Sequence, residues 1–258
     1  MKISIAKKWA VAAAAASAIQ ISGAEIKAIR PLSTDRPDTT ESPYTVDAGH
    51  FQIEMEIGSA TVDGGQKSYG FGETNLKLGI DESTDIQLVL PLYNHIVSGA
   101  EGFGDMQIRV KRNLWGNDSG ETALAVMPYI QLPTGSNGIS DEETQGGVIV
   151  PLAFEGSHGW SYAVQAQFDL VADPSGSGHN FSVLTSATAA HSLTARLGAF
   201  FEIVTVYGEG TAATSEQYLN SGLTWAVSDT VQLDGGARIG ISNDAEDFSP
   251  FFGISAKF

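Results

Sequence analysis

Charged side chains recur at every second position in several stretches of the sequence, with apolar residues between them. Glu54 and Glu56, for example, alternate with Ile53 and Met55. A period of two places such side chains on one face of an extended strand. Carboxylate, ammonium and guanidinium groups that share a face suit ion pairing and the selection of small solutes rather than bond breaking. The candidates for such a selective lining are Glu54, Glu56, Lys77, Arg109, Lys111, Asp169, Arg196, Glu202, Asp234 and Arg238.

Residues that would carry catalysis or bind a metal form a weaker pattern. His191 beside Ser192 is the nearest local pair for a lipid hydrolase, yet the chain has no G-x-S-x-G sequence around a nucleophile. The acidic segments 141–143 and 244–247 lack the spacing of a calcium-binding loop. We therefore expect no enzyme activity, no metal and no cofactor, and we keep a membrane-embedded lipid hydrolase as an alternative.

Apolar and polar residues alternate along most of the chain from His50 onward. In the segment 160–170, large apolar residues occupy every second position, and Gln165, Gln167 and Asp169 lie between them. About twelve segments show this strand pattern, although its boundaries are poorly defined in 121–154 and 180–192. No segment after residue 24 approaches the ~18–20 consecutive apolar residues that a membrane-crossing helix needs. The sequence predicts an all-β fold, a single closed antiparallel transmembrane β-barrel of about 12 strands after a cleaved signal peptide.

Alternation alone does not separate this barrel from a soluble β-sandwich, which also has one apolar face. The charged residues at mid-strand positions suit a water-filled or ion-paired lumen better than the exterior of a soluble domain. Aromatic residues such as Trp115, Trp160 and Trp225 lie near strand ends, where membrane-interface girdles occur. We therefore interpret the apolar face as lipid-facing and keep a secreted β-sandwich as the alternative fold.

The first 49 residues precede the alternating pattern and divide into two parts. Residues 1–24 combine a basic start, an alanine-rich apolar stretch and a small-residue site, which together predict a signal peptide. Residues 25–49 form a proline-containing periplasmic leader or plug, and residues 50–258 form the barrel. As a plug, the leader would place Asp35, Arg36, Asp38 and Glu41 against lumen charges, with Arg36 contacting Glu54 or Glu202. As a tether, it would only cap the barrel.

The last strand supplies the closing edge of the predicted barrel. Phe252, Ile254 and Phe258 share its apolar face, and we expect the barrel-assembly machinery to recognise this C-terminal signal. Short turns alternate with longer polar loops, which predicts that both termini are periplasmic. The formal net charge of −16 argues against binding to nucleic acid. The expected partners are therefore outer-membrane lipid, the assembly machinery and a small-molecule solute.

The segment 34–43, with Asp35, Arg36, Pro37 and Asp38, followed by Gly49 and residues 50–54, resembles the start of a family of bacterial outer-membrane barrels. This family is labelled as a transporter of the MetA pathway of phenol degradation. The likeness continues through 104–105, 132–135, 159–160 and the terminal Phe258, although Thr39 stands where such proteins often have an aromatic residue. The resemblance implies a Gram-negative outer-membrane location and the passage of small, aromatic or hydrophobic compounds.

These observations predict an outer-membrane barrel that acts as a passive, porin-like channel or transporter for small solutes. The role of the lumen charges stays open from the sequence: they either line a pore or pair with each other and fill it. The alternative function is a structural or adhesive barrel with a blocked lumen. The sequence does not identify the solute or the oligomeric state.

Overall fold

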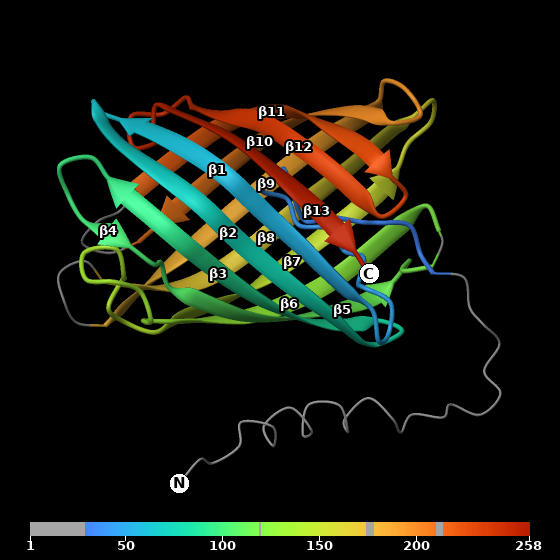
Figure 1. Ribbon diagram of the computed structural model, residues 1–258, viewed down its shortest axis with the longest axis horizontal. Helices are drawn as coiled ribbons and strands as arrows, with labels where there is room; N and C mark the ends of the chain where they lie inside the picture. Colours follow the sequence, from blue (N-terminus) through green and yellow to red (C-terminus); the bar gives the residue numbers. More distant parts are fainter. Residues whose placement is uncertain (1–28, 119, 174–177, 210–213) are drawn as a thin grey trace, which may run out of the picture.

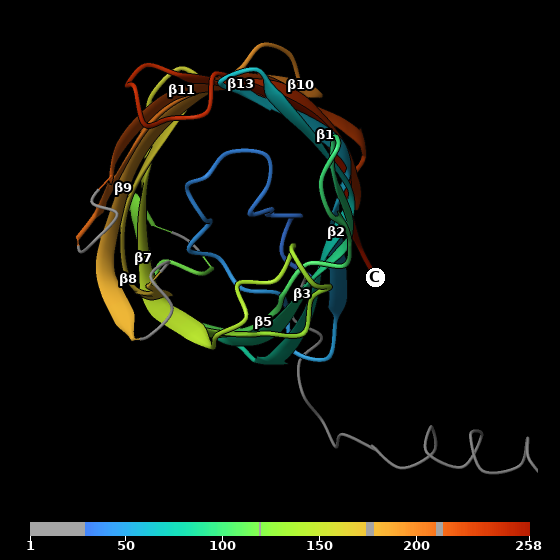
Figure 2. The same ribbon diagram turned by 90° about the vertical axis from the view of Figure 1, so that its left-hand side faces the viewer.

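The structure is a closed, slightly flattened barrel of antiparallel strands with the leader inside it (Figures 1 and 2). This computed structural model describes residues 29–118, 120–173, 178–209 and 214–258, so the predicted signal peptide lies outside the described residues. Among the described residues, no helix is long and apolar enough to cross a membrane. The strands are β1 (Phe51–Asp63), β2 (Gln66–Asp81), β3 (Thr84–Ile96), β4 (Glu101–Gly102), β5 (Met106–Trp115), β6 (Thr122–Leu132), β7 (Gln145–Glu155), β8 (Trp160–Ala172), β9 (His179–Ser192), β10 (Leu197–Gly208), β11 (Thr214–Ser228), β12 (Val231–Gly240) and β13 (Phe248–Lys257).

Twelve of these strands form the wall, and each pairs with its neighbours in sequence order. The barrel closes where β1 pairs antiparallel with β13, in a register that sets Ile53 opposite Ala256. Phe51 and Phe258 then exchange two backbone hydrogen bonds of 3.1 and 2.8 Å. Closure pairs the edge strands with each other, so no strand edge of this sheet is left for lipid. The predicted fold class and strand number are confirmed.

The two faces of the wall are inverted relative to a soluble protein. Gln87 and Lys111 are completely buried on the inside, whereas Phe201 is 65% exposed and Leu170 56% exposed on the outside. Fully buried lysine is rare in soluble domains, and a continuous exposed apolar belt would cause aggregation there. The apolar residues of the alternating pattern therefore face lipid, and the polar residues face the lumen.

Several apolar residues face inward as well, and small residues on neighbouring strands make room for them. Phe251, which breaks the alternation of the last strand, is 7% exposed, and Phe200 is 3% exposed. A Cβ atom added to Gly222 would lie 2.5 Å from the Phe200 ring, and one added to Gly236 would lie 3.0 Å from the Phe251 ring. The two rings therefore occupy space that lumen-facing glycines on β11 and β12 leave free.

The structure resolves the segments whose orientation the sequence left open and corrects some boundaries. In β6 and β7, Met127 and Ile149 face inward, while Val148 faces outward. The alternation of apolar and polar residues is weak in 61–68, where a longer loop is expected, but β1 and β2 continue through this segment and meet in a tight turn, because Gly64 and Gly65 adopt positive φ angles of 54° and 89°. The polar connection after β3 contains β4, which pairs with the end of β3.

The inverted faces predict that an added charge is tolerated only inside the barrel. Val164 is 41% exposed on the outer face of β8, and Val164→Arg should lower the free energy of unfolding by about 2–4 kcal/mol because the guanidinium group would enter lipid. Thr224→Arg, at a β11 position that lines an internal cavity, is the matched control and should cost much less. Urea unfolding in phospholipid vesicles measures both; equal losses would contradict the assignment of faces.

Candidate functional site

The leader forms a loop that enters the barrel and returns to the same end (Figure 2). At its base, Arg30 Nε donates a 2.8 Å hydrogen bond to Asp47, which joins the two limbs. Lys257, on the closing strand, donates to the Arg30 carbonyl oxygen and lies 3.4 Å from Asp47. A backbone bridge between Ala48 and Gly79 fixes the last leader residues to β2. The loop is therefore attached to the wall at both limbs, at what we call the leader end of the barrel.

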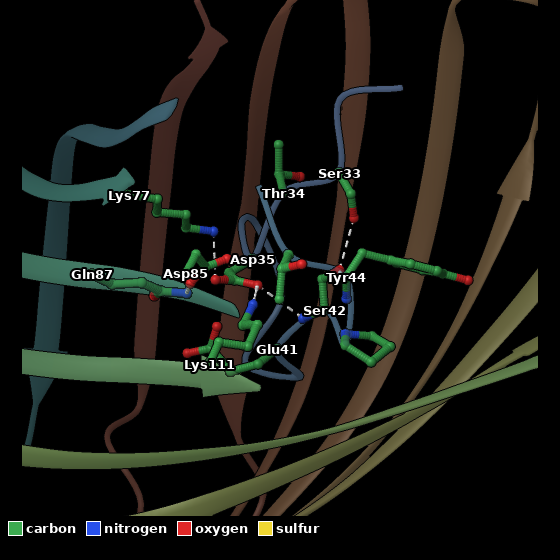
Figure 3. A network of polar contacts seen from close by, with 12 residues as sticks. Ser33, Thr34, Asp35, Glu41, Ser42, Tyr44, Lys77, Asp85, Gln87 and Lys111 are labelled. Atoms are coloured by element: carbon green, nitrogen blue, oxygen red, sulfur yellow. Dashed lines mark hydrogen bonds and ion pairs between the residues drawn. The ribbon is translucent and has the colours of Figure 1, made fainter. Parts of the chain in front are cut away.

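The centre of the leader is held by two lysines from the wall (Figure 3). Asp35 accepts hydrogen bonds of 2.5 Å from both Lys77 and Lys111 and a third, of 3.0 Å, from the Ser42 backbone N–H. Burial by itself would raise the pKa of Asp35, but the ammonium groups of Lys111 and Lys77 outweigh it and hold this pKa below its usual range. This carboxylate is therefore charged inside the barrel.

Glu54 on β1 completes this network from the opposite side. Its carboxylate accepts hydrogen bonds from the backbone N–H groups of Asp35 (2.9 Å) and Arg36 (3.0 Å), from Gln52, and from Lys77. Backbone N–H groups of an irregular segment need such partners when they are buried. The wall thus satisfies the leader's main chain as well as its side chains.

Arg36 ties the leader to two further strands. Its guanidinium group donates to Asp234 on β12 at 2.8 Å and to Glu56 on β1 at 3.3 Å. It also lies over the Phe251 ring, 5.9 Å from the ring centroid. The sequence had suggested Glu54 or Glu202 as its partners; Glu54 instead contacts the Arg36 backbone, and Glu202 is occupied by other leader residues.

Glu202 on β10 holds the tip of the leader at the opposite wall. Its carboxylate accepts hydrogen bonds from the backbone N–H groups of Thr39 (2.9 Å) and Thr40 (2.7 Å) and from the Thr40 hydroxyl (2.6 Å). Burial, followed by repulsion from the Glu202 carboxylate, raises the pKa of Asp38. The leader therefore spans the lumen from β2 and β5, which hold Asp35, to β10.

Glu41 connects the leader to β5 and β8 of the wall. One carboxylate oxygen accepts a 2.8 Å hydrogen bond from Arg109 on β5, and the Glu41 backbone N–H donates to Gln165 on β8 at 2.7 Å. Burial and the Asp35 charge outweigh the cations around it and raise the pKa of Glu41 to about 7. Its second oxygen, Oε2, is buried with no hydrogen-bond partner.

The remaining candidates from the sequence lie apart from the leader. Asp169 accepts a hydrogen bond of 2.7 Å from the Tyr129 hydroxyl, and Arg238 lies over the Phe251 ring at 5.7 Å. Arg196 does not face the lumen: it is exposed in the turn 193–196 before β10. That strand begins one residue later, at Leu197, so the alternation that placed Arg196 inside does not reach it.

Sequence reasoning missed three lumen residues. Glu73 lies two positions before Asn75 on the inward face of β2 and lines two lumen cavities. Asp85, near the start of β3, accepts a 3.0 Å hydrogen bond from the Val46 backbone N–H. Both precede the predicted starts of their strands, and extending the period-two pattern by one residue would have found them. Lys257 faces inward near the end of β13, with 7% of its surface exposed; it already lies on the polar face of the predicted last strand, opposite the face of Phe252 and Ile254.

Internal cavities lie on both sides of the leader. One of about 300 Å³ is bounded by leader residues 35–39 and by β1, β2, β5 and β12. A second, of about 470 Å³, shares Glu73, Gln107 and Arg109 with the first and reaches the loops at the far end. A third, of about 340 Å³, opens toward the leader end and shares Arg36, Pro37 and Asp38 with the first. Residues 36–38 therefore form a septum between the cavities of the two ends.

The barrel end opposite the leader, which we call the loop end, is strongly acidic. Its connecting segments and the adjoining strand ends contain twelve carboxylate residues and one lysine, Lys67. An excess of charges of one sign at such an opening attracts oppositely charged solutes and repels those of like charge. The carboxylates are Asp63, Glu101, Asp105, Asp141, Glu142, Glu143, Asp173, Glu209, Glu216, Asp244, Glu246 and Asp247.

The histidine that the sequence singled out does not join a hydrolase-like group. The His191 ring stacks on Trp160 with centroids 4.6 Å apart, and its Nδ1 lies 3.1 Å from the Gly159 carbonyl oxygen rather than beside a carboxylate. Among the described residues, no group of three or more His, Asp or Glu side chains is placed to bind a metal.

Comparison with known protein families shows which family the chain belongs to. The family profile described as "Putative MetA-pathway of phenol degradation" matches residues 34–258. The chain belongs to this family. The matched range begins within the leader, so residues 34–49 of the segment that enters the lumen are part of the family pattern.

Solved structures show the same fold. An outer membrane channel from Pseudomonas putida F1 superposes with a TM-score of 0.65 at 12% identity, over 83% of this chain and 97% of that chain. The NanC porin superposes with a TM-score of 0.57 at 11% identity, over 81% of this chain and all of that chain. Comparison with curated protein sequences finds no significant match. This chain therefore has the fold of an outer-membrane β-barrel.

The contacts of Asp35 predict that the leader is released when that carboxylate loses its charge. Asp35→Asn leaves two buried ammonium groups facing a neutral amide, and Lys111 then has no charged partner among the described residues. We expect the free energy of local opening of residues 30–48 to fall by about 3 kcal/mol. Hydrogen exchange of the leader amides measures it, with Asp229→Asn on an exposed turn as the control. Unchanged leader protection would contradict the assigned role of Asp35.

Proposed function

We propose that this protein is a passive channel for small solutes, narrowed by its leader. One observation carries the proposal: polar cavities lie on both sides of a septum of only three leader residues, 36–38. A barrel whose lumen served only as a structural core would be filled by packed side chains. The membership of the family and the outer-membrane barrel fold support the same function.

The walls of this path favour small molecules with both polar and apolar parts. Arg109, Glu73 and Gln107 provide charged and amide groups, while Val89 and Ile149 provide an apolar side. The family's description mentions phenol degradation, and a small aromatic compound has this mixed character. We therefore propose small, partly apolar solutes as the class that passes. No residue arrangement among the described parts supports a chemical reaction, so we propose a channel and not an enzyme.

The arrangement of the ends supports an orientation in the membrane. The leader and Phe258 lie at the same end as the short turns, and bacterial outer-membrane barrels have their short turns in the periplasm. We propose that this end is periplasmic and that residues 1–24 are removed as a signal peptide. Phe252 and Phe258 are 53% and 68% exposed on the closing strand, which supports their proposed recognition by the barrel-assembly machinery.

Loosening the septum should increase conductance. Arg36→Ala removes the ion pairs to Asp234 and Glu56, so residues 36–38 lose their ion-pair attachment to β12 and keep the hydrogen bond from the backbone N–H of residue 36 to Glu54 on β1. We expect single-channel conductance in planar bilayers to rise at least about twofold. Arg112→Ala, in an exposed ion pair on the outer surface, is the control. Well-folded wild-type and Arg36→Ala proteins that both conduct no current would support the alternative, a structural or adhesive barrel with a blocked lumen.

The acidic loop end should make the channel prefer cations. In an asymmetric KCl gradient, the reversal potential should have the sign of cation preference, and the preference should weaken as salt screens the loop charges. Replacing Asp141, Glu142 and Glu143 together by Asn, Gln and Gln should reduce it. A reversal potential that shows anion preference, or one unaffected by salt and by the triple variant, would contradict this assignment.

A further inference from the structure

The cavity of about 300 Å³ above the septum contains a carboxylate that forms no ion pair with a described residue. Glu73 on β2 lines this cavity and makes no hydrogen bond or ion pair with a described residue. In the strand register it lies directly opposite Glu56 on β1 and Pro91 on β3. Like charges directly opposite each other in a sheet are destabilising, and Glu56 already accepts from Arg36. The position therefore favours an added cation.

Two further acceptor atoms in the same cavity wall have no partner. Oε2 of Glu41 and Oδ1 of Asn75 are both buried and lack a hydrogen bond, and both residues line the cavity. Buried acceptors without donors are rare, because each loses its hydration without compensation. Both atoms are closed off from the cavity space, so among these three residues Glu73 is the one whose carboxylate is accessible to a molecule in the cavity.

The arginines around the cavity do not fill this role. Arg36 is paired with Asp234 and Glu56, and Arg109 with Glu41 and Gln107. Arg238 has no carboxylate partner within ion-pair distance among the described residues, and its guanidinium group lies over the Phe251 ring. The Glu73 carboxylate is therefore left without an ion-pair partner among the described residues.

The other residues that line the cavity indicate what kind of molecule fits beside Glu73. Val89 and Ile149, 5% and 3% exposed, form an apolar part of the wall together with Leu184. A cavity of about 300 Å³ lies at the lower limit of ordinary ligand pockets. A primary ammonium group offers three donors and a positive charge, and a short hydrocarbon chain suits the apolar side. The acidic loop end would raise the local concentration of such a cation.

We propose that this cavity is a binding site for small organic ammonium ions on the solute path, with Glu73 as the charged anchor. The inference rests on the proposed channel function for its place on a path, but the binding itself does not require conduction. It narrows the solute class from small, partly apolar molecules to those that carry an ammonium group.

The test uses n-butylammonium, with butanoate and 1-butanol as probes of the same length that are anionic and neutral. Isothermal titration of the full mature chain in detergent should give binding of n-butylammonium at least about tenfold tighter than of either control probe, and Glu73→Gln should remove at least about tenfold of that affinity. Glu121→Gln, an exposed carboxylate change at the leader end, should leave it unchanged. Glu73 makes no hydrogen bond or ion pair with a leader residue, and its replacement removes the repulsion from Glu56, so thermal unfolding of Glu73→Gln should not fall below that of the wild type.

Channel recordings separate this inference from the proposed function. In planar bilayers, n-butylammonium should reduce the potassium current of the wild type at concentrations that leave Glu73→Gln unaffected. Equal binding of the three probes, or binding that Glu73→Gln does not weaken, overturns the ammonium site even if the protein conducts. Specific binding of n-butylammonium by a protein that never conducts supports the site and contradicts the channel.

Discussion

Two buried lysine ammonium groups determine where the leader lies. Lys77 and Lys111 project from β2 and β5 into the barrel, and both are almost completely removed from water. An uncompensated buried charge is so costly that each must find a carboxylate. The wall offers Glu54 to Lys77, but Asp35 of the leader is the group that contacts both. The leader is therefore an integral part of the barrel interior, because its Asp35 pairs with two lysines of the wall.

This arrangement follows from the membrane environment. Because lipid surrounds the barrel, the outer face accepts only apolar side chains, and every charged residue at a mid-strand position must face the lumen. A lumen with many charges then needs counter-charges and main-chain donors to fill it. The leader, with its prolines and its irregular backbone, offers unpaired N–H groups that Glu54 and Glu202 accept. The polar wall and the non-helical leader thus satisfy each other.

The leader also contacts the strands at which the barrel closes. Lys257 lies on the strand that closes the barrel and contacts the Arg30 carbonyl oxygen and Asp47 at the base of the leader loop. Arg36 bridges β1 and β12, which flank the closing strand β13 on its two sides. The network is dense at the leader end and at the septum, whereas Glu73, above the septum, forms no hydrogen bond or ion pair with a described residue.

The sequence by itself determined the barrel, because period-two alternation is a local property that each strand carries independently. It placed Glu54, Lys77, Lys111 and Asp234 on the inner face before any contact was known. It did not determine which charges meet, since Asp35 and Lys111, or Arg36 and Asp234, are far apart in the chain and are brought together only by barrel closure. It also left the leader open between plug and tether. Only the tertiary structure decided that the leader enters the lumen, because the free energy of pairing its charges depends on groups from β1, β2, β5, β10 and β12 assembled around one space.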